Sequence, residues 1–255
     1  MAKRGWHRWL RSGAGLCLLG STVVAHAEDT ELPPDATIQI GNVSLTNSDV
    51  HANADGSFTF AGQQRGGSFN GAPIWDVLWD LTLNPEPSIA GTLTLTNLTD
   101  TARPFSFAFG LPVLPGFSTS VLGGSVTTSL LDANLDGSAT LTANLAKSPN
   151  IYRGTIDGVT VLSLFALDQL TCFGAGCSAS GGDSDGLPGL TLSGPGVIGA
   201  IGTLIGFTLS PHDSVTISTN FTVEPTPVPL PAALPLLMIG LGGFAAQRRL
   251  LQRRT

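Results

Sequence analysis

The chain has 255 residues, of which only 12% are charged, while Gly (32 residues) and Pro (17 residues) are abundant. This composition favours an all-β domain with many turns, because helical proteins need long polar helix faces. The net charge of −6 conceals a strong segregation: residues 28–224 hold all 18 acidic residues against four basic ones, a net charge of −14. A domain so acidic repels nucleic acid and anionic surfaces, which excludes nucleic acid as a partner.

Residues 1–27 have the pattern of a secretory signal peptide. Four basic residues precede an apolar stretch at 14–24, and Ala25-His26-Ala27 puts small residues where signal peptidase reads them. We therefore predict cleavage by signal peptidase after Ala27. The apolar stretch is shorter than the about 20 residues of a membrane span, and an uncleaved anchor is the alternative.

Residues 28–223 alternate apolar and polar side chains, the period of β-strands. The clearest runs are 75–83, 92–98, 105–111 and 215–223, and weaker ones are 37–45, 57–60, 125–131, 139–145, 155–167 and 197–209. About ten short strands with one apolar face each predict a β-sandwich, because each sheet must bury its face on another. Pro85-Glu86-Pro87 reads as a turn.

Two details of this domain have competing interpretations. Trp75 and Trp79 fall on an apolar strand face, which predicts burial in the core, with stacking on carbohydrate as the alternative. The Gly- and Ser-rich residues 178–189 read as a mobile loop or a boundary between subdomains. We expect one domain.

Export sets the redox state of the cysteines. Cys17 leaves with the leader, so Cys172 and Cys177 remain as a pair in an oxidising compartment. We predict a disulfide between them that closes a small loop and fixes local shape.

Asp132, Asn134 and Asp136, followed by Gly137, match the first half of a calcium loop. The twelfth position of that loop is Ala143 instead of the bidentate Glu, which rules out an EF-hand. A hairpin turn is the favoured interpretation, and weak calcium binding is the alternative. Asp183 and Asp185 form a second, similar candidate. No other cofactor is expected.

Catalytic patterns are weak. The string 182–186 fits a nucleophile elbow and 194–199 fits a dinucleotide loop, but neither has the strand and helix context that its chemistry needs. After leader removal only His51 and His212 remain, and both read as surface loop residues. We predict that the chain is not an enzyme and that it has no catalytic residues. A secreted hydrolase with paired carboxylates is the least favoured alternative.

The last 32 residues have three parts. A Pro-rich motif covers 224–231, an apolar segment that we expect to be a single transmembrane helix covers 232–246, and an Arg cluster covers 247–255. The basic residues of this cluster are Arg248, Arg249, Arg253 and Arg254, which would stay cytoplasmic.

This order, with Val228-Pro229-Leu230-Pro231-Ala232-Ala233 at the motif, resembles the PEP-CTERM sorting signal, although Glu224-Pro225 is the nearest trace of a Pro-Glu-Pro. The resemblance is confined to the tail. It implies processing by exosortase, a membrane protease-transpeptidase of Gram-negative bacteria that make exopolysaccharide, and transient residence in the inner membrane before release to the cell surface or beyond.

Together these features predict an exported cell-surface or extracellular-matrix protein of structural or interaction type, sorted through its tail and associated with exopolysaccharide or biofilm. A calcium- or carbohydrate-binding module is the alternative.

Overall fold

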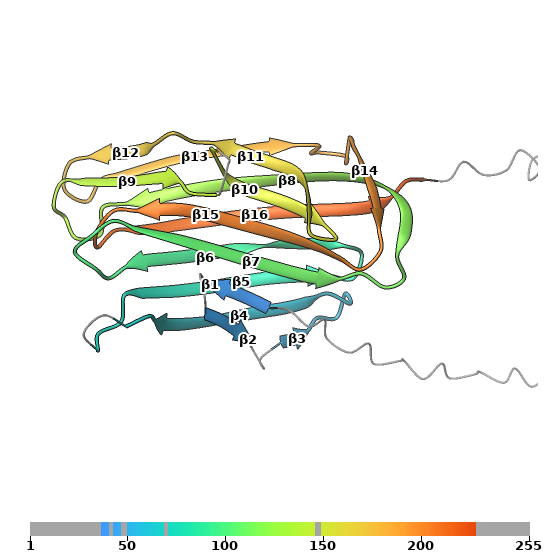
Figure 1. The fold of residues 1–255 in the computed structure, drawn as a ribbon, viewed down its shortest axis with the longest axis horizontal. Helices are drawn as coiled ribbons and strands as arrows, with labels where there is room; N and C mark the ends of the chain where they lie inside the picture. The colour runs from blue at the N-terminus through green and yellow to red at the C-terminus, as the bar shows by residue number, and fades with distance from the viewer. Residues whose placement is uncertain (1–36, 41–42, 47–49, 69–70, 146–148, 228–255) are drawn as a thin grey trace, which may run out of the picture. The chain divides into compact units, whose positions relative to one another are not determined.

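The computed structural model describes residues 37–40, 43–46, 50–68, 71–145 and 149–227. These residues form sixteen β-strands in two antiparallel sheets, without a helix (Figure 1). The first sheet has the order β11 (Val159–Ala166), β10 (Asn150–Ile156), β15 (Ala200–Leu209), β7 (Arg103–Pro112), β1 (Thr37–Ile40) and β2 (Val43–Thr46), and β9 (Ser138–Ala143) joins β15 to β12 (Leu170–Phe173). The second has the order β13 (Ser178–Asp185), β8 (Phe117–Leu131), β16 (Ser214–Pro225), β6 (Ser88–Asn97), β5 (Trp75–Asn84), β4 (Phe58–Gly66) and β3 (Val50–Ala52), and β14 (Leu192–Val197) pairs with β8.

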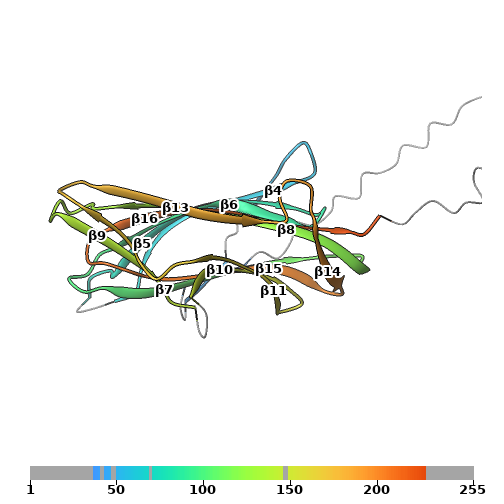
Figure 2. The ribbon, with the colours of Figure 1, turned by 90° about the horizontal axis from the view of Figure 1, so that it is seen from above.

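The two sheets form two layers (Figure 2). Their facing side chains build one apolar core. On β5, every second residue from Trp75 to Leu83 is buried, which is the alternation that the sequence predicted. The ring of Phe207 on β15 packs against Phe105 and Phe107 of β7, with ring centroids 6.0 and 6.1 Å apart. The all-β class is therefore confirmed, and the layered arrangement fits a β-sandwich.

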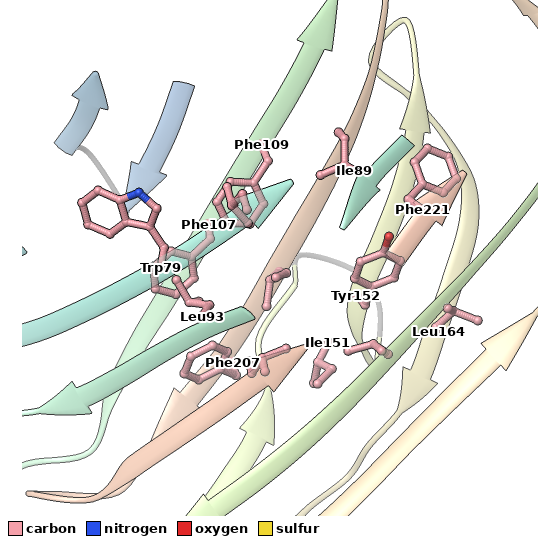
Figure 3. Packing of buried hydrophobic residues seen from close by; sticks show 14 of the residues in the cluster. Trp79, Ile89, Leu93, Phe107, Phe109, Ile151, Tyr152, Leu164, Phe207 and Phe221 are labelled. Carbon is pink, nitrogen blue, oxygen red and sulfur yellow. The ribbon is translucent and has the colours of Figure 1, made fainter. Parts of the chain in front are cut away.

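At one contact between the two layers, a glycine faces the ring of Phe221, which Figure 3 shows among the buried core residues. A Cβ atom on Gly154 of β10 would lie 2.6 Å from a ring carbon of Phe221 on β16. Tyr152, two residues earlier, is fully buried in the same region, and its hydroxyl has no hydrogen-bond partner. Burial in this apolar core raises the pKa of the Tyr152 hydroxyl.

Trp75 and Trp79 belong to this core. Their exposed fractions are 4% and 5%, and the ring centroid of Trp79 lies 6.2 Å from that of Phe60. The prediction that they are core residues is confirmed. Stacking of either indole on a carbohydrate is excluded, because neither ring reaches the surface.

The prediction of about ten short strands was wrong: the described residues form sixteen, and β8 and β16 are 15 and 12 residues long. The run 155–167 divides into β10 and β11, because Asp157 and Gly158 both take positive φ and turn the chain. The run 197–209 likewise divides at Ile198 and Gly199, between β14 and β15. Periodicity alone did not reveal these turns, because apolar residues flank them closely.

Residues 178–189 are not a loop or a boundary over most of their length. Residues 178–185 form β13, which pairs with β8 from Ser178↔Leu131 to Asp185↔Gly124. A Cβ on Gly182 would lie 2.6 Å from the Val126 carbonyl oxygen, so the missing side chain lets the two strands lie close. Glycine in this segment thus serves strand packing rather than flexibility.

Several predictions lie outside the described residues: the leader with its cleavage after Ala27, the sorting motif at 228–233, the apolar segment at 232–246 and the Arg cluster. Within the part of the chain that the structure describes, no helix has the length and apolar character needed to cross a bilayer.

Candidate functional site

The Asp132–Gly137 segment connects β8 of one sheet to β9 of the other. The hairpin interpretation was therefore wrong in its topology, because a hairpin joins two paired neighbours of one sheet. The turn chemistry is present nonetheless. The Asn134 Oδ1 atom accepts the Asp136 N–H at 3.0 Å, and Asp136 Oδ1 accepts the Ser138 N–H at 3.1 Å.

The three predicted calcium ligands do not share one environment. Asp132 is 1% exposed, whereas Asn134 and Asp136 are exposed. The oxygens of Asn134 and Asp136 are engaged within the loop, since Asn134 Nδ2 also donates to Asp136 Oδ2 at 2.9 Å. Across the described ranges, no three His, Cys, Asp or Glu side chains are grouped as a metal-ligand set. Calcium binding by this loop stays a prediction.

Asp132 is held by two other segments. Its Oδ2 atom accepts the N–H groups of Gly137 and Gly176, each at 3.0 Å, and its own N–H donates to the Cys177 carbonyl at 3.0 Å. The Oδ1 atom is buried and has no hydrogen-bond partner. The carboxylate thus ties the β8–β9 connection to the loop between β12 and β13.

The predicted disulfide between Cys172 and Cys177 is present, and it closes that second loop. The Cα atoms are 5.7 Å apart, and the Cys177 N–H donates to the Gly174 carbonyl at 2.9 Å. Since Gly176 and Cys177 both contact Asp132, the disulfide fixes the loop that holds this carboxylate.

Sequence reasoning missed Asp213, which lies in the turn between β15 and β16. The side chain is 0% exposed, its Oδ2 atom accepts a hydrogen bond from the Ser210 hydroxyl, and its Oδ1 atom has no partner. Burial raises the pKa of Asp213, the Ser210 hydroxyl and the Ala133 N–H lower it, and the negative charges of Asp132 and Asp136 raise it further. Pro211-His212-Asp213 had indicated only a turn, because no local pattern reports that a turn residue points inward.

The second calcium candidate and the catalytic-looking strings have other roles. Asp183 Oδ2 accepts the Phe165 N–H at 3.0 Å, and Asp185 Oδ1 accepts the Gly186 N–H at 2.8 Å. Ser184 lies inside strand β13 rather than at a turn from strand to helix, and residues 194–197 lie in β14. These segments connect and pair strands.

The two histidines that follow the leader, His51 and His212, lie on different elements. His51 belongs to the short strand β3, so its assignment to a loop was wrong, although it is exposed as predicted. His212 is in the β15–β16 turn, where its Nε2 atom lies 2.7 Å from Asp100 Oδ1. The Asp100 side chain is 99% exposed, so this pair is a surface contact of small energetic weight.

The outer side of the second sheet is rich in hydroxyl groups. We call the following set the hydroxyl face: Thr92, Thr94 and Thr96 of β6, Ser214, Thr216 and Ser218 of β16, Thr127 and Ser129 of β8, and Ser180 of β13. Strand register places them in rows, one of which runs Ser180, Ser129, Thr216 and Thr94 across four strands. These residue types occupy the positions opposite the core residues, so the alternation of the sequence contained the signal.

Hydrogen bonds order part of the hydroxyl face. Between β6 and β16, the hydroxyls of three facing pairs lie within 3.3 Å: Thr92 with Ser218, Thr94 with Thr216, and Thr96 with Ser214. Toward β8 and β13 the hydroxyl face contains a hollow of ≈410 Å³. Gly181 and Gly182 line this hollow together with Thr127 and Ser129. Neutral donors and acceptors at fixed strand spacing can hydrogen-bond a polar, uncharged polymer.

No family model matches this chain, and the search of curated proteins returned no significantly similar sequence.

Proposed function

We propose that this chain is an exported, non-catalytic β-sandwich protein of the cell surface or extracellular matrix, with a structural or interaction role next to exopolysaccharide. Signal peptidase removes residues 1–27, and an exosortase-like transpeptidase recognises the tail at 224–255. The transmembrane segment at 232–246 holds the protein in the inner membrane until that step.

Three features support the location. The leader ends in a signal-peptidase pattern, the tail orders a Pro-rich motif, an apolar segment and arginines, and the disulfide between Cys172 and Cys177 suits an oxidising compartment. The acidic surface between the two ends favours solubility outside the cell and disfavours binding to nucleic acid.

The hydroxyl face is the observation that carries the interaction role. It spans four strands, its rows are held in register by the sheet, and it lies opposite the apolar core. Glycans expose many hydroxyl groups. These groups can exchange hydrogen bonds with Ser and Thr hydroxyls, directly or through bridging water, so the hydroxyl face suits contact with a glycan.

Tail deletion tests the sorting part. A variant ending at Thr226, which keeps all of β16, should be exported but fail to reach the surface fraction that holds the intact protein. If the truncated form reaches the same fraction with the same processing, the tail has no sorting role.

Replacing single hydroxyls tests the interaction part. Thr127→Val removes an exposed hydroxyl at the hollow and keeps the shape and strand preference of the residue. Thr82→Val on β5 is the matched control, because Thr82 is also exposed but lies outside the hydroxyl face. Cosedimentation with exopolysaccharide of the host should weaken for Thr127→Val alone. Equal retention of the two variants would refute glycan contact at this hollow.

A further inference from the structure

Two carboxylates from distant parts of the chain are buried at one end of the fold. Asp132 follows β8 and Asp213 precedes β16, and their exposed fractions are 1% and 0%. The loop and the turn that carry them are in contact, since Asn134 Nδ2 donates to the Pro211 carbonyl at 3.4 Å. The Ala133 N–H also lies close enough to the Asp213 carboxylate to lower its pKa.

Each carboxylate is anchored through one oxygen and leaves the other without a protein partner. Asp132 Oδ2 accepts two N–H groups and Asp213 Oδ2 accepts the Ser210 hydroxyl, whereas both Oδ1 atoms are buried and form no hydrogen bond. The anchoring fixes both side chains in place, so the bare oxygens are held in position before any ligand arrives.

Such an arrangement is unfavourable without a neutralising partner. Moving a carboxylate out of water costs several kcal/mol, and a second nearby carboxylate adds repulsion. Neither of the salt bridges found among the described residues, Arg65–Asp76 and His212–Asp100, includes Asp132 or Asp213. When both are ionised, two carboxylates with unpartnered oxygens carry the charge that balances a divalent cation.

We propose that Asp132 and Asp213 bind a calcium ion through their Oδ1 atoms and so fasten the β8–β9 connection to the β15–β16 turn. This site differs from the loop of Asp132, Asn134 and Asp136, because its second ligand is 81 positions away in the sequence. The inference does not depend on the sorting or glycan proposals.

The ligand chemistry favours calcium among the common cations. Both side-chain ligands are carboxylates, with no nitrogen or sulfur atom, which suits hard cations rather than zinc or copper. Calcium accepts six to eight oxygens in flexible geometry, so waters and loop oxygens complete its shell, whereas magnesium demands near-ideal octahedral geometry.

Thermal unfolding of the full-length chain in a non-ionic detergent, stripped with a chelator at neutral pH, tests the site. With CaCl₂ at about 10 mM, and a dissociation constant of about 0.1–1 mM as in extracellular calcium modules, the Tm should rise by about 3–11 °C. Magnesium or sodium chloride at matched ionic strength should give a much smaller rise.

Four variants separate this site from its alternatives. Asp213→Asn and Asp132→Asn should each lose the calcium-dependent rise, because asparagine keeps an oxygen for the anchoring bonds but not the charge. Asp80→Asn, an exposed residue of β5, is the control for loss of one charge. It should keep the rise, as should Asp136→Asn, whose oxygens are engaged in the loop.

The wild-type measurement decides the matter even if a variant does not fold. No rise with calcium would mean that protons or water satisfy the two oxygens, and the proposal would be wrong. An equal rise with magnesium would show nonspecific stabilisation, and a rise retained in both Asp213→Asn and Asp132→Asn would place calcium elsewhere. Either result overturns the site.

Discussion

Asn97 connects three segments at the end of the fold that carries Asp213. It is the last residue of β6 and is 0% exposed. Its Nδ2 atom donates to the carbonyls of Thr101, Leu209 and Ser210 at 2.9, 3.2 and 3.0 Å, and its Oδ1 atom accepts the N–H and hydroxyl of Thr99 at 3.1 and 2.8 Å. Asn97→Ala would remove all of these contacts together.

The expected loss in the free energy of unfolding follows from the number of polar groups that lose a hydrogen-bond partner. Two N–H protons of the Asn97 amide serve three carbonyls, and one oxygen serves two donors, which amounts to about four net hydrogen bonds worth about 1 kcal/mol each. We expect Asn97→Ala to lower the free energy of unfolding by about 3–5 kcal/mol and the Tm by about 6–20 °C.

Urea unfolding followed by tryptophan fluorescence measures this loss. Asn84→Ala is the matched control, because Asn84 accepts only the Glu86 N–H, at 3.0 Å in an exposed turn, and should cost at most about 1 kcal/mol. If Asn97→Ala is no more destabilising than Asn84→Ala, the contacts of Asn97 do not stabilise this end of the fold and the reasoning fails.

Three further predictions concern the core, the disulfide and acid stability. Gly154→Ala should lower the unfolding free energy by about 1–3 kcal/mol, because the new Cβ atom meets the buried ring of Phe221. Gly110→Ala is the control and should be tolerated, since a Cβ there has no atom within 4 Å. Urea titrations compare the two variants, and equal losses would contradict the close approach of the sheets at Gly154. Cys172 and Cys177 lie 5 positions apart, and replacing both by Ser should lower the free energy of unfolding by about 2 kcal/mol in the same assay. An unchanged urea midpoint would contradict stabilisation by the disulfide. The N–H groups of the β14–β15 turn lower the pKa of Asp157, so the stabilisation from its carboxylate is present above the unfolded pKa of 3.8 and is lost as the pH falls through the folded value. Asp157→Asn should therefore flatten the fall in stability below about pH 4. Acid titrations of both proteins measure this, and an equal fall in the two would contradict it.

Strands whose two faces differ in polarity were predictable from the sequence. The runs 75–83, 105–111 and 215–223 lie within β5, β7 and β16 because one face of each meets the core and the other meets solvent. The segment 178–185 was not recognised as β13, because its Gly, Ser and Asp residues have no strand preference of their own, and pairing with β8 imposes the conformation.

Some features of the candidate sites were likewise predictable from the sequence, and others were not. The disulfide was predictable because two cysteines and an export signal suffice to infer it. The partnership of Asp132 with Asp213 was not, because it arises from the path of the chain between the sheets, and nothing local to either residue reports the other. The hydroxyl face needed strand register, since Ser180, Ser129 and Thr216 align only after β13, β8 and β16 have paired.

The intact mass of the protein recovered from the surface and medium of its native host decides whether the tail is cleaved during sorting. We expect the mass to lack residues 1–27 and the apolar segment with its Arg cluster, and any added mass at the new C-terminus would identify what the transpeptidase joined to it. A mass that retains the chain through Thr255 would contradict sorting by cleavage and would make the protein a simple membrane-anchored ectodomain.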